Sequence, residues 1–313
     1  MLDEFFQFGA TTARGNSIIH IGDCLSFLKE QVDRGVFYDA IVTDPPYEIS
    51  LHGKEWDSTG IAFSNELWSL FYDALKPGGY VISFAASRFY HRVAIAAETA
   101  NFRILPMLTW EFPNGLPKPV NVSELFDRDN VKDRKPIGYR SGSGFTTANE
   151  KHGAQQRITK QFPVYERGVS QEAKDWDGFY YGNNCLKPVF EPMIFAQKEP
   201  SEKRMIDNIR KHGVGALNLG AVKKMRDDDK WIDPIFRHPK ATRKEHNSDH
   251  PSVKPVSLMK ELCTLVCPPG GHVLDPFGGS GSTAVAAIEC GFDCTIVEQN
   301  PEMEQIIKSR LNK

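Results

Sequence analysis

The sequence predicts an α/β fold in which a mostly parallel sheet is covered by helices on both faces. Short apolar runs rich in β-branched residues alternate with amphipathic stretches at both ends of the 313-residue chain. The runs are continuously apolar, which is typical of strands buried on both faces. This rhythm lapses between Pro113 and His250, which predicts one α/β domain interrupted by an insertion.

The first part of the chain carries four predicted strands and three predicted helices. The strands are expected at residues 17–22, 38–44, 80–86 and 103–112, although Pro106 weakens the last one. The helices are expected at residues 23–35, 64–79 and 89–102. The second helix has Leu67, Leu70 and Phe71 at helical spacing, and a Pro-Gly-Gly sequence predicts its end.

The same alternation returns near the C-terminus. Helices are expected at residues 257–267, 280–291 and 301–311, with strands at 272–277 and 294–298 between them. One further strand, "KPVFEPMIFAQK" near 188–198, is predicted within the insertion. We assign it to the main sheet as its one antiparallel member.

Composition and charge limit the class of protein. The values of 40% hydrophobic and 25% charged residues are ordinary for a globular protein. No run of 18 apolar residues and no secretory signal is present, so a cytoplasmic protein without membrane contact is expected. The cysteines lack CxxC pairs and metal-ligand spacing, so core thiols and no metal site are expected for Cys263, Cys267, Cys290 and Cys294.

The charge distribution is uneven, although the formal net charge is only −2. Residues 131–168 contain eight cations and three anions, and residues 236–247 contain four Lys or Arg and one Glu. Such basic stretches suit a surface that faces phosphates. A solvated, loop-rich insertion explains the same charges, and charge by itself leaves both interpretations open.

The first chemical motif is Asp44-Pro45-Pro46-Tyr47, directly after an apolar strand. Two prolines fix their own φ angles and make the loop stiff, while Asp44 offers a carboxylate and Tyr47 an aromatic face. A planar heterocycle with an amino group would suit this arrangement. The alternative is a strand-ending turn with a buried tyrosine.

The second motif is a glycine-rich turn, "DPFGGSGST", which joins a predicted strand ending at Asp275 to a helix. The next predicted strand ends at Glu298, an acid that suits ribose hydroxyls. The turn has neither G-x-G-x-x-G nor Gly-Lys-Ser/Thr, so the expected cofactor is nucleoside-like but neither a dinucleotide nor a triphosphate. A tight turn that serves only packing is the alternative.

Together these motifs resemble those of the DNA amino-methyltransferases, which act on adenine N6 or cytosine N4 with S-adenosylmethionine. The order, with "DPPY" before the glycine loop, resembles the permuted subgroup found in phages and bacteria. "HPSVKPVSLMKEL" is similar to that subgroup's cofactor-flanking motif. The resemblance implies a Rossmann-like, doubly wound sheet with a catalytic half at 1–112, a target-recognition insertion at 113–249 and a cofactor-binding half at 250–313.

The resemblance also implies roles for single residues. Asp44 and the Pro45 carbonyl would accept hydrogen bonds from the amino group of an extruded base, Pro46 would stiffen the loop, and Tyr47 would stack on the base. Glu298 would bind ribose hydroxyls and Asp23 the adenine amino group of the cofactor. The remaining cofactor ligands expected are Lys254, Asp275, Phe277, Gly278, Gly279 and Gly281. Ser282 stands where the family often has threonine.

The expected activity is site-specific methylation of duplex DNA by base flipping and direct transfer. Adenine N6 is favoured over cytosine N4 because Asp leads the motif. Methylation of RNA or of a protein amine, and DNA binding without catalysis, are the alternatives. A homodimer and a cognate restriction endonuclease are expected as further partners. Trp56 and Asp57 are candidates for closing a loop over the base, and an ordinary surface loop is the alternative.

Overall fold

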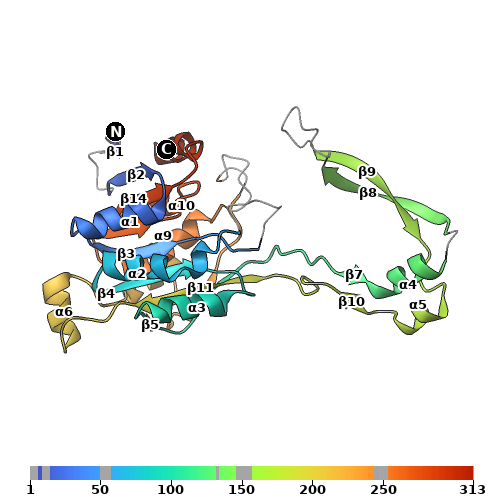
Figure 1. Cartoon of the computed structure of the whole chain (residues 1–313), viewed down its shortest axis with the longest axis horizontal. Helices are drawn as coiled ribbons and strands as arrows, with labels where there is room; N and C mark the ends of the chain where they lie inside the picture. The colour runs from blue at the N-terminus through green and yellow to red at the C-terminus, as the bar shows by residue number, and fades with distance from the viewer. Residues whose placement is uncertain are drawn as a thin grey trace. The chain divides into compact units, whose positions relative to one another are not determined.

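The computed structural model describes residues 6–8, 15–49, 58–131, 134–145, 157–242, 245 and 253–312. The chain forms two compact units, shown in Figure 1. Unit 1 comprises Met1–Asn114 and Val189–Lys313, and unit 2 comprises Gly115–Pro188. The second half of the expected insertion, from Val189 onward, therefore belongs to unit 1.

Unit 1 is built on one large mixed sheet with the strand order β1-β2-β14-β13-β3-β4-β11-β6-β12, and β5 pairs with β11. Neighbouring strands from β2 to β4 in this order are parallel, whereas β11 runs antiparallel to β4 as predicted. The strands are β1 (Phe6–Phe8), β2 (Ser17–Ile21), β3 (Tyr38–Thr43), β4 (Leu75–Phe84), β5 (Arg103–Ile104), β6 (Leu108–Glu111), β11 (Phe190–Gln197), β12 (Ile235–Arg237), β13 (His272–Asp275) and β14 (Asp293–Glu298).

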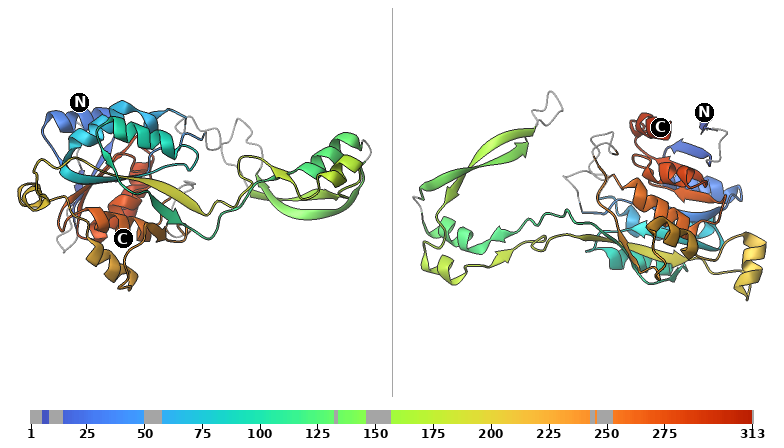
Figure 2. Two further views of the ribbon diagram at one scale, coloured as in Figure 1. Left: turned by 90° about the horizontal axis from the view of Figure 1, so that it is seen from below. Right: turned by 180° about the vertical axis from the view of Figure 1, so that it is seen from behind.

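Helices cover both faces of this sheet, as the left view of Figure 2 shows. Successive strand residues point to opposite faces. Val42 and Ile82 therefore join the core under α7, α9, α10 and α11, whereas Ile41 and Val81 join the core under α1, α2 and α3. The helices of unit 1 are α1 (Cys24–Asp33), α2 (Asn65–Ala74), α3 (Tyr90–Thr99), α6 (Met205–His212), α7 (Leu219–Arg226), α9 (Val256–Val266), α10 (Ser282–Glu289) and α11 (Met303–Leu311).

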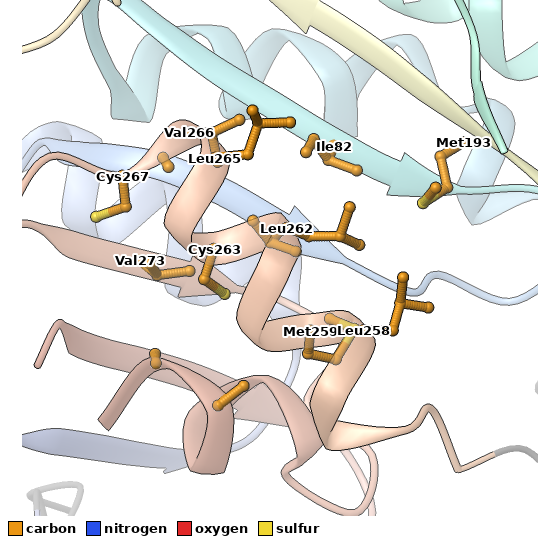
Figure 3. Close-up of a cluster of buried hydrophobic side chains, with 14 of the residues drawn as sticks. Ile82, Met193, Leu258, Met259, Leu262, Cys263, Leu265, Val266, Cys267 and Val273 are labelled. Atoms are coloured by element: carbon orange, nitrogen blue, oxygen red, sulfur yellow. The ribbon is translucent and has the colours of Figure 1, made fainter. Parts of the chain in front are cut away.

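Helix α9 has eight buried residues, and several of their side chains are drawn in Figure 3. Its side chains Leu258 and Leu262 are fully buried and face the sheet beside Ile82 and Met193. Burying each such leucine contributes about 1.5–3 kcal/mol to stability. Because Pro255 directly precedes α9, this packing also fixes the residues just before the helix, which lie at the candidate site.

Two predicted elements differ in detail from the structure. Residues 103–112 form two short strands, because Pro106 lacks a backbone donor and interrupts the ladder. Strand β4 begins at Leu75, five residues before its expected start, and its Pro-Gly-Gly segment produces a register shift against β3. Residues 199–249, which belong to the stretch where the alternation of strands and helices was expected to lapse, contain α6, α7 and β12.

Unit 2 is built from two strand pairs and two short helices. Its elements are β7 (Val120–Asn121), α4 (Val122–Asn130), β8 (Pro136–Phe145), β9 (Arg157–Tyr165), α5 (Gln171–Asp175) and β10 (Tyr180–Tyr181). Strands β8 and β9 pair with each other, and β7 pairs with β10. The buried Asp127 of α4 accepts hydrogen bonds from the backbone amides of Val169 and Ser170, which ties α4 to the start of α5.

The described part of the chain has no helix that is both long and apolar enough to span a membrane.

Candidate active site

The sequence motifs meet at one edge of the unit 1 sheet. Parallel strands place their carboxyl ends at the same edge, where α/β proteins bind ligands. Asp44 follows the end of β3, Asp275 ends β13 and Glu298 ends β14. Ile21, the last residue of β2, pairs with Glu298. Asp44 and Glu298 are 254 residues apart in sequence, yet they lie at the ends of strands in the same part of the sheet.

A hydrogen bond joins the strand that precedes the Asp44–Tyr47 motif to the start of the glycine-rich turn. The hydroxyl of Thr43, the residue before Asp44, donates to Oδ1 of Asp275 at 2.7 Å. The hydroxyl of Thr283 donates to Oδ2 at 2.5 Å, and the amide of Phe277 donates to Oδ1 at 3.1 Å. Burial raises the pKa of Asp275 to about 6 against these donors. Asp275 thus holds strand β3 and the start of the turn together.

The glycine-rich turn presents backbone rather than side chains beside Glu298. The amide of Gly279 donates to Oε2 of Glu298 at 2.7 Å, and the amide of Gly278 donates to the carbonyl of Val297 at 2.7 Å. Gly279 and Gly281 have φ angles of 51° and 82°, which disfavour residues with a Cβ. Burial raises the pKa of Glu298 above its usual value.

Asp23 caps the helix that follows β2. Its Oδ2 accepts from the amide and the hydroxyl of Ser26, each at 2.8 Å, at the start of α1. The amide of the preceding Gly22 donates to the carbonyl of Glu298 at 2.9 Å. The two predicted cofactor acids, Asp23 and Glu298, therefore lie on adjacent strand ends.

Asp44 belongs to a partly buried group of charges, which we call the charge cluster: Asp44, Glu191 and Lys254. Nζ of Lys254 lies 2.6 Å from Oδ2 of Asp44 and 3.5 Å from Oε2 of Glu191. The hydroxyl of Tyr47 donates to Oε2 of Glu191 at 2.6 Å. The side chain of Lys254 is only 8% exposed, so these contacts are largely shielded from water.

The electrostatics of the charge cluster follow from burial and pairing. Burial raises the pKa of the Asp44 carboxyl, and the ammonium of Lys254 opposes this effect. Burial would lower the pKa of Lys254, but the carboxylates of Asp44 and Glu191 outweigh it and raise the pKa. Burial, reinforced by Asp44 and Glu191, raises the pKa of Tyr47 well above its usual value. Tyr47 is therefore a neutral donor.

Three aromatic rings surround the same ammonium. Nζ of Lys254 lies 4.7 Å from the ring centroid of Phe84, 5.0 Å from that of Tyr47 and 5.8 Å from that of Trp110. Such distances allow cation–π attraction, which grows when the cation is desolvated. The rings and the two carboxylates together fix the position of the ammonium.

One acceptor in the charge cluster is left over. Oδ1 of Asp44 is buried and has no hydrogen-bond partner among the residues that the structure describes. A buried carboxylate oxygen without a donor is costly, at about 1–3 kcal/mol or more, so such an atom is uncommon outside functional sites.

The structure brings most of the predicted site residues together and adds three. Lys254, predicted as a cofactor ligand, has its ammonium on Asp44 instead. Glu191, Thr43 and Thr283 were not predicted. A charged residue inside the apolar strand "VFEPMIFA" was the available signal for Glu191. Trp56 and Asp57 lie outside the described residues, and no cluster of three potential metal ligands occurs within the described part of the chain.

Sequence comparisons match this chain to DNA methyltransferases. The profile of a family described as DNA methylase, of the N6 and N4 type, matches residues 38–309. The type II methyltransferase M.HindIII of Haemophilus influenzae is 31% identical over 259 residues, covering 82% of this chain and 69% of that protein. The type II methyltransferase M.BglI of Bacillus subtilis is 25% identical over 92% of this chain and 83% of its own length.

Solved structures show the same fold. The M1.HpyAVI–SAM complex superposes with a TM-score of 0.57 at 18% identity, covering 95% of this chain and 100% of that one. The cytosine-N4-specific PvuII DNA methyltransferase superposes with a TM-score of 0.54 at 14% identity, covering 97% and 96%.

Proposed function

This chain belongs to the family of N6- and N4-type DNA methylases, and from this premise we propose that it methylates N6 of adenine in duplex DNA. Membership makes it an S-adenosylmethionine-dependent amino-methyltransferase that acts on DNA. The choice of adenine, the roles of the site residues and the recognition role of the insertion are our proposals.

The observation that carries the proposal is the free acceptor of Asp44. Its Oδ1 lacks a donor within the described residues, while Lys254 occupies Oδ2 at 2.6 Å. An exocyclic amino group would supply that missing donor. The base would stack on the ring of Tyr47, and the hydroxyl contact with Glu191 at 2.6 Å holds this ring in place.

The chain's own residues suggest how transfer proceeds. Asp44 and the Pro45 carbonyl accept from the amino group, so its lone pair points toward the cofactor edge. The new C–N bond forms as the C–S bond breaks, and the nitrogen then releases a proton. Asp44 lies next to that nitrogen and has a raised pKa, so it is placed to take the proton. Orientation supplies most of the acceleration.

The glycine-rich turn fits S-adenosylmethionine, which supplies an electrophilic methyl group when bound. A Cβ built on Gly279 would meet no atom within 4 Å, so the backbone there has open space beside it. Glu298 accepts one amide on each oxygen, from Gly279 and Asn300, and each carboxylate oxygen retains a second lone pair for a ribose hydroxyl. Asp23, on the adjacent strand end, would contact the cofactor's adenine, and Phe277 would line the same site.

Adenine is preferred over cytosine because the motif begins with Asp rather than Ser. Extrusion of the base is required in either case, because a stacked amino group is badly oriented for attack. Extrusion costs about a few kcal/mol.

Methyl-labelled cofactor and mixed-sequence duplex DNA test the proposal directly. After reaction, the DNA is digested to nucleosides and analysed by mass spectrometry. We expect the wild type to produce N6-methyladenine. In Asp44→Ala the rate of methyl transfer should fall by about 100-fold or more, while the affinity for the cofactor should be unchanged. N4-methylcytosine would correct the base, and label in RNA or protein only would refute a DNA substrate.

Unit 2 is our candidate for reading the DNA sequence. Arg140 and Lys160 lie exposed on the β8–β9 hairpin, where cations can meet phosphates. In the other basic stretch, Arg237 is paired with Asp233 at 2.9 Å, and Lys240 lies 4.2 Å from the ring centroid of Phe112. The hairpin therefore offers the freer cations of the two.

The curated relatives are named type II methyltransferases, and this supports a role in restriction–modification. We extend the proposal to a cognate restriction endonuclease whose cleavage the methylation blocks. A homodimer stays a prediction, and light scattering of the purified protein would test it.

A further inference from the structure

We propose that Lys254 and Glu191 are positioning residues that set the geometry of the base clamp. Lys254 occupies one oxygen of Asp44 so that only Oδ1 remains for the base, and Glu191 anchors the ring of Tyr47. This inference rests on the proposed function, and it gives Lys254 a different role from the cofactor contact that the motif resemblance implies.

The contacts give each residue one defined task. Nζ of Lys254 lies 2.6 Å from Oδ2 of Asp44, which prevents this oxygen from rotating toward a substrate. Oε2 of Glu191 accepts from the Tyr47 hydroxyl at 2.6 Å and also lies 3.5 Å from Nζ of Lys254. Glu191 therefore connects the Tyr47 ring to Lys254, and through Lys254 to the carboxylate of Asp44.

The supporting elements make this arrangement rigid. Glu191 belongs to β11, which pairs with β4 and β6 on its two sides. Lys254 precedes the buried helix α9, and the rings of Phe84 and Trp110 flank its ammonium. Side chains held by strands and packed rings can fix a clamp within the small tolerance that methyl transfer requires.

The net charge of the charge cluster also matters. Two carboxylates and one ammonium leave one negative charge next to the reacting nitrogen. Lys254 attracts the negative form of Asp44, whereas Glu191 repels it. The other ionisable groups facing this region are Tyr47, which stays neutral, and Asp275, which interacts with Asp44 from β13.

Two nearly isosteric variants should shift the pKa of Asp44 in opposite directions. Lys254→Met removes an attraction, so the pKa of Asp44 should rise and the acid limb of the rate profile should move to higher pH by about 1–3 units. Glu191→Gln removes a repulsion, so the same limb should move to lower pH. A residue that served only packing would not produce shifts of opposite sign.

The test uses the full chain, S-adenosylmethionine and unmethylated mixed-sequence duplex DNA under single-turnover conditions. The rate at saturating cofactor should fall about 100-fold in Lys254→Met, with cofactor affinity within about twofold of wild type. Lys254→Arg, which keeps the charge, should recover part of the rate. A large loss of cofactor affinity in Lys254→Met would overturn the inference, because Lys254 would then be a cofactor ligand.

A second measurement needs no DNA. The titration of Asp44 is followed by carboxyl carbon NMR in the wild type and both variants, and Asp44→Asn assigns the signal. Shifts of opposite sign in the pKa of Asp44 support the inference, and equal or absent shifts overturn it.

Thermal unfolding shows whether each variant is folded. If Glu191→Gln does not fold, Tyr47→Phe removes the contact between Tyr47 and Glu191 from the other side. If the wild type transfers no methyl group to DNA, the proposed function fails, while this titration still decides whether the charge cluster acts as described.

Discussion

Single residues hold parts of the site together, and Asp275 is the clearest case. Predicted as a cofactor ligand, it has hydrogen bonds from Thr43, Thr283 and Phe277 on its two oxygens. Three protein donors leave it little capacity for a direct ligand contact. Its position fixes the spacing between the Asp44–Tyr47 motif and the glycine-rich turn.

Asp275 should also make stability depend on pH. Its pKa is about 6 in the folded protein against an ordinary value of 3.8, so the folded state holds the proton more tightly. Stability from this group is therefore present below pH 4 and is lost as the pH rises from 4 to 6, by up to about 3 kcal/mol.

Urea unfolding at several pH values measures this effect for the wild type and Asp275→Asn. The wild-type minus variant difference in unfolding free energy should fall between pH 4 and 6, because the amide does not titrate. A difference that stays constant with pH would show that burial does not raise the pKa of Asp275.

At the scale of elements, the junction between the glycine-rich turn and α10 depends on Gly281. Its φ angle is 82°, and a Cβ there would lie 3.1 Å from Cγ2 of Ile307 in α11. Gly270 has a φ angle of 70° but has no atom within 4 Å of a built Cβ, so it is a matched control for backbone strain.

Both alanine substitutions should destabilise the protein, and Gly281→Ala should destabilise it more. The left-handed backbone costs each variant about 1–2 kcal/mol. Crowding against Ile307 should add about 1–3 kcal/mol and weaken cofactor binding in Gly281→Ala only. Chemical denaturation and isothermal titration calorimetry measure the two effects, and equal losses would mean that α11 moves aside at little cost.

The elements themselves were largely predictable from the sequence. Continuous apolar runs such as the predicted strand at 38–44 form strands, and the helix predicted at 23–35 corresponds to α1 at Cys24–Asp33. Boundaries were less predictable where pairing decides them. The Pro-Gly-Gly segment was interpreted as a helix end. In the structure it lies within β4, because Leu75–Phe84 forms one strand that pairs with β3 and β11.

At the scale of the whole molecule, the division into two units predicts that unit 2 can be removed. Its helices are tied to each other through Asp127, and the amide of Phe112 donates to the carbonyl of Val189 at 2.8 Å within unit 1. The ends left by removing Gly115–Pro188 are therefore close, and a short Gly-Ser linker can join them.

The shortened chain should fold and keep its cofactor affinity, because the glycine-rich turn and the charge cluster lie in unit 1. It should lose sequence-specific DNA methylation if unit 2 reads the DNA. Circular dichroism, cofactor titration and the labelled-methyl assay report these properties separately. Full retention of site-specific methylation would place target recognition in unit 1.

The sequence by itself determined the chemistry: "DPPY" and the glycine-rich turn lie at the ends of predictable strands, Glu298 is the last residue of another, and their residue types specify what they can bind. Local patterns suffice here because strand ends and turns depend on neighbouring residues. Only the tertiary structure decided that Lys254 pairs with Asp44 and that Glu191 accepts a hydrogen bond from the hydroxyl of Tyr47. These partners are 210 and 144 residues apart in sequence, and strand order and helix packing, rather than local preference, bring them within hydrogen-bonding distance.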